Sequence, residues 1–384
     1  MESRDLVAIR EQAETPSFVL HLGDLRRNAQ ILREVKEAAG CKILLALKGF
    51  ANFRTFGLFQ DVLDGACASS FNEARLGREE FGGEVGVFSP AYRDQDIEGL
   101  LGVADNIIFN SFAQLRRYRE RILTHVRTVE IGLRINPEHS EGAVDIYNPC
   151  ARFSRLGIPI SQWDGDDLDG VTGLHFHTLC EQNSDALEAT LAVVEAKWGD
   201  WLPKMSWVNF GGGHHITRGD YDRARLIRLI RNFRQRYDVD VYLEPGEAVA
   251  LNAGVFVTQV VDLLYNERDI AILDCSAQCH LPDVLEMPYR PEIVGAGMPG
   301  EYAHSYLLGG QTCLAGDVFG EWSFPEPLKP GDRLIFTDMA HYTMVKTNTF
   351  NGINLPTIAH FEPKTQTLTP VRQFGYHDFH TRLG

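Results

Sequence analysis

The chain has 384 residues, of which 44% are hydrophobic and 23% are charged, and its formal net charge is −15. This length favours one large barrel with an appendage, or two domains, over a single small core. The negative charge argues against a nucleic-acid partner, because such binding relies on Lys and Arg to neutralise phosphates. It is compatible with a small cationic substrate.

The sequence also predicts a location. No stretch reaches the ~18 consecutive apolar residues of a membrane span, and the start, residues 1–5, lacks the basic and apolar segments of a secretory signal. The seven cysteines are an odd number scattered along the chain, which does not suit a disulfide framework. We therefore expect a soluble, cytoplasmic protein with free thiols and no membrane partner.

In chain order, short apolar runs alternate with stretches of helical spacing, which predicts repeating β-α units. The strand candidates are residues 43–47, 65–68, 84–88, 106–109, 129–135, 171–176, 207–210 and 241–243. The clear helix candidates are residues 72–80, 111–123, 184–196 and 221–237. Eight units predict a (β/α)8 TIM barrel, an α/β fold whose active site lies at the carboxyl ends of the strands.

Beyond the eighth unit the pattern changes to β-branched and aromatic runs without intervening helices. These runs are residues 255–264, 270–274, 333–337 and 357–361. They predict a separate β-domain, a sandwich or a barrel, which the early run at residues 15–22 can join. We place the barrel at residues 24–250 and the β-domain at residues 1–23 and 251–384.

Two strand ends carry residues suited to carbonyl chemistry. Lys48 follows the first apolar run, and partial desolvation there lowers an amine's pKa so that it can attack an aldehyde. Glu244 follows the eighth run, which is next to the first in a closed barrel, and a carboxylate there can keep the nitrogen of a pyridine ring protonated. Taken singly, Lys48 fits a solvated lysine better, and Glu244 fits a carboxylate that caps a turn better.

Glycines and histidines follow the sixth and seventh runs. The triplet Gly211–Gly213 can let backbone amides converge on a phosphate. We expect His175 and His177 to point to different faces, and choose His177 as the one that reaches the barrel mouth and stacks on a cofactor ring. A metal-dependent hydrolase is the rival, since these residues and the pair 214–215 resemble a ligand set. The order of ligands along the strands is the reverse of that class, and we expect no metal.

Six ordered blocks extend over most of the chain. They are Leu-Ala-Leu-Lys at 45–48, Gly-Leu-His-Phe-His at 173–177, Asn-Phe-Gly-Gly-Gly-His at 209–214, Glu-Pro-Gly-Glu-Ala at 244–248, the run at 281–291 and Thr-Cys-Leu-Ala-Gly-Asp at 312–317. Together they resemble the fold-type III pyridoxal-phosphate decarboxylases, which include ornithine, arginine and diaminopimelate decarboxylases. Within that group, the blocks are most similar to the carboxynorspermidine decarboxylases.

The resemblance implies a cofactor, pyridoxal 5'-phosphate, and roles for the barrel residues. Lys48 would hold the cofactor covalently, and His177 would stack on its ring. Gly211, Gly212 and Gly213 would contact its phosphate, and Glu244 would pair with its ring nitrogen.

The resemblance also implies roles for the β-domain. Tyr342 would contact the phosphate, and Cys313 would help to return a proton to the substrate. In the family the loop that carries this cysteine reaches the active site of the neighbouring subunit, which implies a homodimer with shared active sites. Taken singly, both residues fit ordinary loops better than functional ones.

One departure from the family concerns the substrate. Ornithine-type enzymes have an Arg three residues after the Glu of Glu-Pro-Gly, and this chain has Glu247 there. We expect Glu247, Asp283 and Glu286 to pair with the ammonium groups of a carboxylated polyamine. The prediction is a carboxy-lyase that converts carboxynorspermidine or carboxyspermidine to norspermidine or spermidine in polyamine biosynthesis. Decarboxylation of ornithine, arginine or diaminopimelate, a metal-dependent barrel hydrolase and a non-catalytic carrier of the cofactor remain alternatives.

Overall fold

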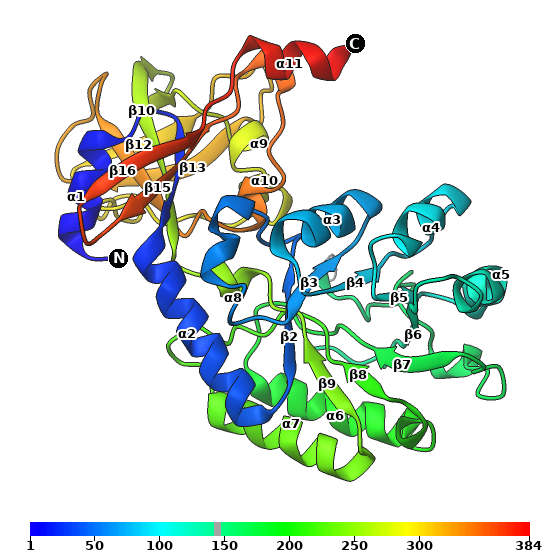
Figure 1. Ribbon diagram of the computed structural model, residues 1–384. Helices are drawn as coiled ribbons and strands as arrows, with labels where there is room; N and C mark the ends of the chain where they lie inside the picture. Colours follow the sequence, from blue (N-terminus) through cyan, green and yellow to red (C-terminus); the bar gives the residue numbers. More distant parts are fainter. Residues whose placement is uncertain (142–146) are drawn as a thin grey trace. The chain divides into compact units, whose positions relative to one another are not determined.

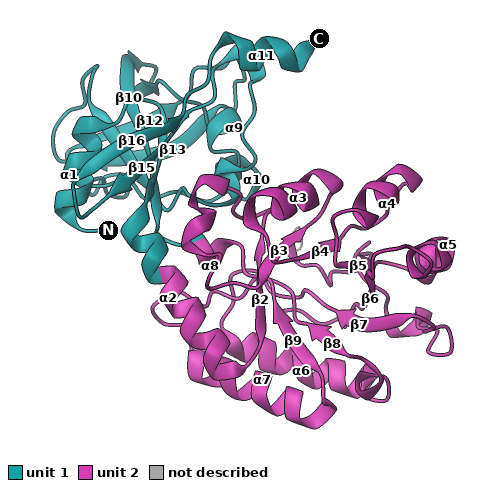
Figure 2. Ribbon diagram, viewed as in Figure 1, with its two compact units in different colours: residues 1–27, 250–384 teal, residues 28–249 magenta. Residues whose placement is uncertain are grey.

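The computed structural model describes residues 1–141 and 147–384. The chain divides into two compact units, drawn in different colours in Figure 2. Residues 28–249 form the barrel unit, and residues 1–27 with 250–384 form the sheet unit.

The barrel unit contains eight parallel strands that close into a barrel in chain order (Figure 1). They are β2 (Lys42–Ala46), β3 (Gly65–Ala68), β4 (Glu84–Phe88), β5 (Asn106–Phe109), β6 (Glu130–Arg134), β7 (Val171–His175), β8 (Trp207–Asn209) and β9 (Asp240–Leu243). Pairing of Lys42 with Tyr242 and of Ile43 with Leu243 closes the ring between β2 and β9. Each strand matches its predicted run to within one residue at either end, and the predicted TIM barrel is confirmed.

Side chains fill the inside of the barrel. Trp207 packs there with Leu44, Ile108 and Tyr242. The indole has room because the neighbouring strand carries a glycine: a Cβ on Gly173 would lie 2.0 Å from it. Because such an interior is a packed core and not a pore, the ends of the strands are the part of the barrel left to bind ligands.

Helices follow most of the barrel strands. They are α3 (Phe71–Leu76), α4 (Asp94–Leu101), α5 (Phe112–Leu123), α6 (Ser184–Trp198), α7 (Arg223–Tyr237) and α8 (Glu247–Ala250), while α2 (Leu22–Ala39) precedes the first barrel strand. Polar side chains accept hydrogen bonds from backbone amides at the starts of α3, α5, α6 and α7. Asp222 accepts a hydrogen bond from the amide of Arg225, so α7 begins two residues later than predicted. The helix predicted at 72–80 is α3 followed by a π-helical turn at Gly77–Phe81.

The sheet unit is built on one mixed sheet of eight strands. They are β1 (Ser17–His21), β10 (Gly254–Tyr265), β11 (Asp269–Leu273), β12 (His304–Gly309), β13 (Val318–Phe324), β14 (Arg333–Thr337), β15 (Thr357–Glu362) and β16 (Thr367–Arg372). The order is β13-β12-β11-β10-β1-β15-β16, and β14 also pairs with β10. The first half of β10 pairs with β1 and β14 and the second half with β11, and the β10–β11 pairing contains a register shift between Val260 and Asp262. The separate β-domain is confirmed, although β12, β13 and β16 were not predicted.

The first strand of the chain lies in the middle of this sheet. β1 runs antiparallel to β10 and parallel to β15, so that Val19 lies opposite both Val255 and Ala359. These three side chains are buried in one apolar cluster, which explains why a short early strand joins two late ones. The helices of this unit are α1 (Ser3–Gln12), α9 (Ala277–His280), α10 (Asp283–Glu286) and α11 (Tyr376–Leu383).

Two further expectations can be compared with the structure. All seven cysteines lie within the described residues, and all are free. Among the helices of residues 1–141 and 147–384, none has both the length and the apolar character that crossing a membrane requires.

Candidate active site

Lys48 stands two residues beyond the end of β2, at the carboxyl ends of the barrel strands. Its Nζ lies 3.4 Å from Nε2 of His177. Although the side chain is exposed, the protein packed around it removes enough water to lower the pKa of its ammonium group, and the nearby charge of Arg134 lowers it further. Lys48 is therefore poised to lose its proton and act as a nucleophile.

His177 presents an unprotonated nitrogen to Lys48. Its Nδ1 lies 3.1 Å from the carbonyl oxygen of Gly212, and a ring nitrogen facing a carbonyl must donate. Burial, and then the charge of Lys48, hold the pKa of His177 well below its ordinary value, so the ring is neutral. Nε2 then has a lone pair directed at Lys48 and can receive a proton from it.

Glu244 follows the end of β9 and is ionised. Burial alone would raise its pKa, but the charge and hydrogen bond of His175, the hydrogen bond of Asn209 and the charge of Lys48 outweigh burial and lower it. Nε2 of His175 lies 3.2 Å from Oε2 of Glu244, and Nδ2 of Asn209 donates to Oε1 at 2.7 Å. The site therefore contains one carboxylate held in place by two polar side chains.

The expectation that only one of the two histidines at the end of β7 reaches the site is wrong. His175 contacts Glu244 and His177 contacts Lys48. Residues two apart along a strand point to the same side, so both rings can face the barrel mouth. His175 is 2% exposed and stacks on the ring of Phe88, which fixes its orientation.

The glycine triplet forms a tight turn directly after β8. Gly211 and Gly213 have φ angles of +70° and +82°, which favour glycine. A Cβ on Gly212 would lie 2.6 Å from the carbonyl oxygen of Glu244, and one on Gly213 would lie 2.1 Å from that of Leu179. No helix begins here, since α7 starts only at Arg223, so this turn can offer an anion backbone amides but no helix terminus.

Two residues that contact His177 or Glu244 were not predicted from the sequence. Arg134, the last residue of β6, is 4% exposed, donates to the carbonyl oxygen of His177 at 3.3 Å and lies 4.4 Å from the centre of the Phe88 ring. Burial lowers its pKa to about 10. Asn209 bridges Glu244 and the amide of Gly211. Each is a polar residue at the end of a barrel strand, and this position in the sequence could have identified both as candidate site residues.

Glu247, which was predicted to bind substrate, opens α8 three residues after Glu244. Its Oε2 lies 3.4 Å from Nε2 of His215. Glu181 is the third member of this group: one possible ligand atom from each of the three side chains lies within 4.8 Å of the others.

The histidines considered for a metal-dependent hydrolase do not gather into one set of ligands among the described residues. His175 and His177 contact Glu244 and Lys48, as described above. The ring of His214 is buried, and burial lowers its pKa to about 4. His215 alone joins the carboxylates of Glu181 and Glu247.

The remaining predicted site residues belong to the sheet unit. Asp283 and Glu286, on α10, share the ammonium group of Lys346, at 2.5 and 2.9 Å. That ammonium also lies 5.9 Å from the centre of the Tyr342 ring. The structure thus brings Asp283, Glu286 and Tyr342 together around a lysine that was not predicted to take part.

Cys313 lies on an exposed loop between β12 and β13. Its amide donates to Oδ1 of Asn351 at 2.7 Å. Asp317 shapes the same loop, since its carboxylate accepts hydrogen bonds from the Thr312 amide at 3.0 Å and from Ser276 Oγ at 3.0 Å. The thiol therefore projects from a loop with a defined conformation.

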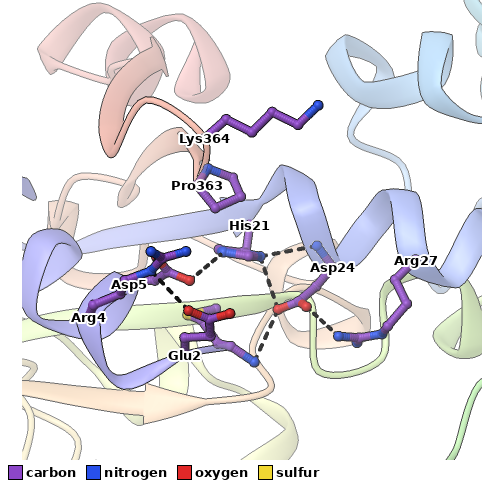
Figure 3. A pocket seen from close by; sticks show the side chains of 9 residues that line it. Glu2, Arg4, Asp5, His21, Asp24, Arg27, Pro363 and Lys364 are labelled. Carbon is purple, nitrogen blue, oxygen red and sulfur yellow. Dashed lines mark hydrogen bonds and ion pairs between the residues drawn. The ribbon is translucent and has the colours of Figure 1, made fainter.

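The sheet unit also contains a pocket of about 400 Å³ that none of the predicted site residues lines. His21 lies between two carboxylates there (Figure 3): Nε2 is 3.3 Å from Asp5 and Nδ1 is 3.0 Å from Asp24. The amino group of Met1 is 3.3 Å from Asp24. These contacts join the start of the chain and α1 to β1 and α2.

Comparisons with known proteins agree with this geometry. The family model described as "Pyridoxal-dependent decarboxylase, C-terminal sheet domain" matches residues 62–340. A carboxynorspermidine/carboxyspermidine decarboxylase of Campylobacter jejuni is 43% identical over 97% of this chain and 99% of that protein. A carboxyaminopropylagmatine decarboxylase of Synechocystis is 45% identical over 96% of this chain and 95% of that protein.

Solved structures agree as well. The crystal structure of carboxynorspermidine decarboxylase from Campylobacter jejuni, complexed with norspermidine, matches with a TM-score of 0.87 and 42% identity, over 96% of this chain and all of that one. Diaminopimelate decarboxylase from Helicobacter pylori shares the fold, with a TM-score of 0.82 and 17% identity over 99% of both chains. The lysine, carboxylate and glycine turn at the strand ends thus occur in a chain that belongs to the pyridoxal-dependent decarboxylases, enzymes whose cofactor is pyridoxal phosphate.

Proposed function

We propose that this decarboxylase removes the α-carboxylate of a carboxylated polyamine, carboxynorspermidine or carboxyspermidine, and forms norspermidine or spermidine. The observation that carries the proposal is the ionised carboxylate of Glu244 in the same cluster as Lys48. When bound, pyridoxal phosphate supplies a ring that accepts the electron pair left on Cα as carbon dioxide departs. A carboxylate that keeps the ring nitrogen protonated strengthens that withdrawal.

The barrel residues fit the cofactor. Lys48 has a lowered pKa and would hold it covalently, while the neutral His177 ring would stack on its ring and keep a proton acceptor beside Nζ. The glycine turn of residues 211–213 excludes any Cβ, so backbone amides can approach a phosphate closely. Glu244 would pair with the ring nitrogen, held in place by His175 and Asn209.

The sheet unit would complete the site. We propose that Tyr342 contacts the phosphate and that Cys313 helps to return a proton to Cα, from the neighbouring subunit of a homodimer. The exposure of Cys313 on a shaped loop supports this role. The division into a cofactor-binding barrel and a β-domain that serves the active site of a dimer is part of this proposal, as is a cytoplasmic location.

Subunit complementation tests the shared site. In such a site Lys48 comes from one subunit and Cys313 from the other. A mixed dimer of Lys48→Ala and Cys313→Ala subunits would therefore contain one site with both wild-type residues. Activity that rises when the two variants are mixed is the expected result. If mixing gives only the average of the two, the site is not shared.

Acidic residues support the polyamine as substrate. Glu247 lies at the strand ends of the barrel unit, while Asp283 and Glu286 already bind one ammonium group, that of Lys346, at 2.5 and 2.9 Å. A pair of carboxylates that holds a lysine ammonium has the right chemistry for the ammonium groups of a polyamine. In that complex the substrate would displace Lys346 or share the pair with it.

A second candidate is carboxyaminopropylagmatine, which the Synechocystis relative, at 45% identity, is named for. This compound ends in a guanidinium group and not in an ammonium group. A guanidinium is planar and pairs with carboxylates through two parallel hydrogen bonds, so the two substrates place different demands on the acidic residues.

Release of carbon dioxide tests the proposal. The purified holoenzyme is assayed with carboxynorspermidine, carboxyspermidine, carboxyaminopropylagmatine, ornithine, arginine and diaminopimelate. The highest kcat/KM is expected for one of the first two. The highest value for carboxyaminopropylagmatine would select the second candidate, and activity on ornithine, arginine or diaminopimelate alone would refute both.

A further inference from the structure

Three polar side chains meet at the strand ends of the barrel unit, and the proposed roles use only one of them. They are Glu181, in the loop after β7, His215, in the loop after β8, and Glu247, at the start of α8. One nitrogen or oxygen atom of each lies within 4.8 Å of the others. Glu181 is exposed, Glu247 is half-buried and His215 is buried.

The backbone holds these three segments together. Gln182 and His214 form a parallel β-bridge between the two loops, and the amide of Gln182 donates to the carbonyl oxygen of Gly213 at 3.1 Å. Oγ1 of Thr217 donates to the carbonyl oxygen of Ala248 at 2.6 Å, which attaches the second loop to α8. The grouping therefore follows from the fold and does not depend on side-chain rotamers alone.

His215 points to a ligand. It is 5% exposed, and neither of its ring nitrogens has a hydrogen-bond partner among the described residues. Its Nε2 stands 3.4 Å from Oε2 of Glu247. Buried polar groups are nearly always hydrogen-bonded, so a ring left in this state beside two carboxylates suits a bound group rich in N–H donors. A positive charge on that group would also relieve the repulsion between Glu181 and Glu247.

The cluster lies within electrostatic reach of the Lys48 site through Cys180. Burial raises the pKa of the Cys180 thiol to about 11, and the negative charges of Glu181 and Glu247 add to this increase, while Lys48 opposes it. Charges in the acidic cluster and on Lys48 thus both affect the pKa of the Cys180 thiol. A polyamine bound at the cofactor site beside Lys48 carries further ammonium groups along its chain and can reach such a neighbouring cluster.

We propose that Glu181, Glu247 and His215 form a subsite for one ammonium group of the polyamine substrate. Glu181 is then a specificity-determining residue. An ammonium group has up to three N–H donors, which match the carboxylate oxygens of Glu181 and Glu247 and one ring nitrogen of His215. This inference rests on the proposed function, because it assumes that a polyamine is the substrate.

The test uses the variants Glu181→Gln and Glu181→Asp of the holoenzyme. Steady-state decarboxylation of carboxynorspermidine gives kcat and KM, and calorimetry gives the Kd of the product norspermidine. The control is Glu188→Gln on α6, which removes a carboxylate that pairs with Arg228 at 3.2 Å on the exposed face of that helix.

Glu181→Gln should raise both KM and the norspermidine Kd by roughly 10-fold, as expected when one charge-assisted hydrogen bond is lost, with kcat within about twofold of the wild type. Glu181→Asp, which keeps the charge, should recover part of the affinity, and Glu188→Gln should change neither constant.

Unchanged KM and Kd in Glu181→Gln, in an enzyme that does decarboxylate carboxynorspermidine, would overturn the subsite and leave the proposed function standing. A wild type inactive on every carboxylated polyamine would instead overturn the proposed function. Stoichiometric zinc or manganese in the purified wild type, lost in Glu181→Gln, would show a metal site in place of the amine subsite.

Discussion

Alanine in the glycine turn after β8 tests whether the backbone there must approach its neighbours closely. Gly213 has a φ angle of +82°, and a Cβ would lie 2.1 Å from the carbonyl oxygen of Leu179. The left-handed conformation costs a residue with a Cβ about 1–2 kcal/mol. The steric overlap adds about 1–3 kcal/mol to the cost of the substitution, since the atom that must move to make room belongs to the backbone. Gly213→Ala should therefore lower the free energy of unfolding by roughly 2–5 kcal/mol.

Two other glycines of the barrel unit separate these contributions. Gly82 has φ and ψ angles of +77° and −166°, a region essentially restricted to glycine, and nothing lies within 4 Å of the position that a Cβ would take, so Gly82→Ala should cost only the conformational part, about 1–3 kcal/mol. Gly219 has neither a positive φ angle nor a neighbour within 4 Å, and Gly219→Ala should be close to neutral. The three variants form a series in which one physical cause is added at each step.

Urea unfolding of the protein freed of cofactor measures the three free energies without a contribution from cofactor binding. Titration with pyridoxal phosphate, followed by absorbance, then gives the affinity of each variant. Gly213→Ala should weaken binding, while Gly82→Ala should not. Equal stability and equal affinity of these two variants would refute the argument, because they would show that the turn has room for a Cβ and that no close backbone approach is needed.

Three further predictions concern charged groups. Glu244→Gln should lower kcat about 100-fold or more, because the fixed negative charge is lost, while the enzyme still binds pyridoxal phosphate. An unchanged kcat, measured at saturating substrate, would exclude Glu244 from the chemistry. Lys346→Met should lower the KM for carboxynorspermidine, because the carboxylates of α10 lose their internal ammonium group. Loss of this half-exposed ion pair should lower the free energy of unfolding in urea by at most ~1 kcal/mol. A higher KM would mean that Lys346 positions these carboxylates. Burial would raise the pKa of Asp24, but the hydrogen bond and charge of His21, together with the charges of Arg27 and of the amino group of Met1, outweigh burial and lower the pKa from 3.8 to about 2. The carboxylate therefore stabilises the fold above pH 3.8, and this contribution is lost as the pH falls through 2. The stability difference between the wild type and Asp24→Asn should therefore shrink over that range, and a constant difference in urea unfolding would contradict the assignment.

The barrel could be predicted because its information is local. Each strand is a short apolar run buried by the helices around it, and polar residues such as Lys48 and Glu244 mark where the runs end. Strand ends of a parallel barrel meet at one rim, so sequence position alone brought these two residues together. The same rule applied to β6 and β8 would have included Arg134 and Asn209.

The sheet unit was harder to predict because its pairings are remote in sequence. β16 is mostly exposed and carries Pro370, which suits an edge strand but weakens the strand pattern in the sequence. Lys346 lies 60 residues or more from the two acidic residues it binds, and nothing local marks it as their partner. The sequence predicted that Asp283 and Glu286 bind ammonium groups, but only the fold shows that they already hold a cation.

The position of β1 has a consequence for how the protein folds while the ribosome synthesises it. Residues 17–21 leave the ribosome early, yet their partners in β15 are residues 357–362. At about 5–20 residues per second, translation separates the two strands by roughly 15–70 s. The barrel unit is one continuous stretch, residues 28–249, and can fold during that interval. The apolar side chains of β1 have no partner strand until β10 is made and lack their second partner until β15 is made, so the nascent chain should be most prone to misfolding or to chaperone binding at its first strand.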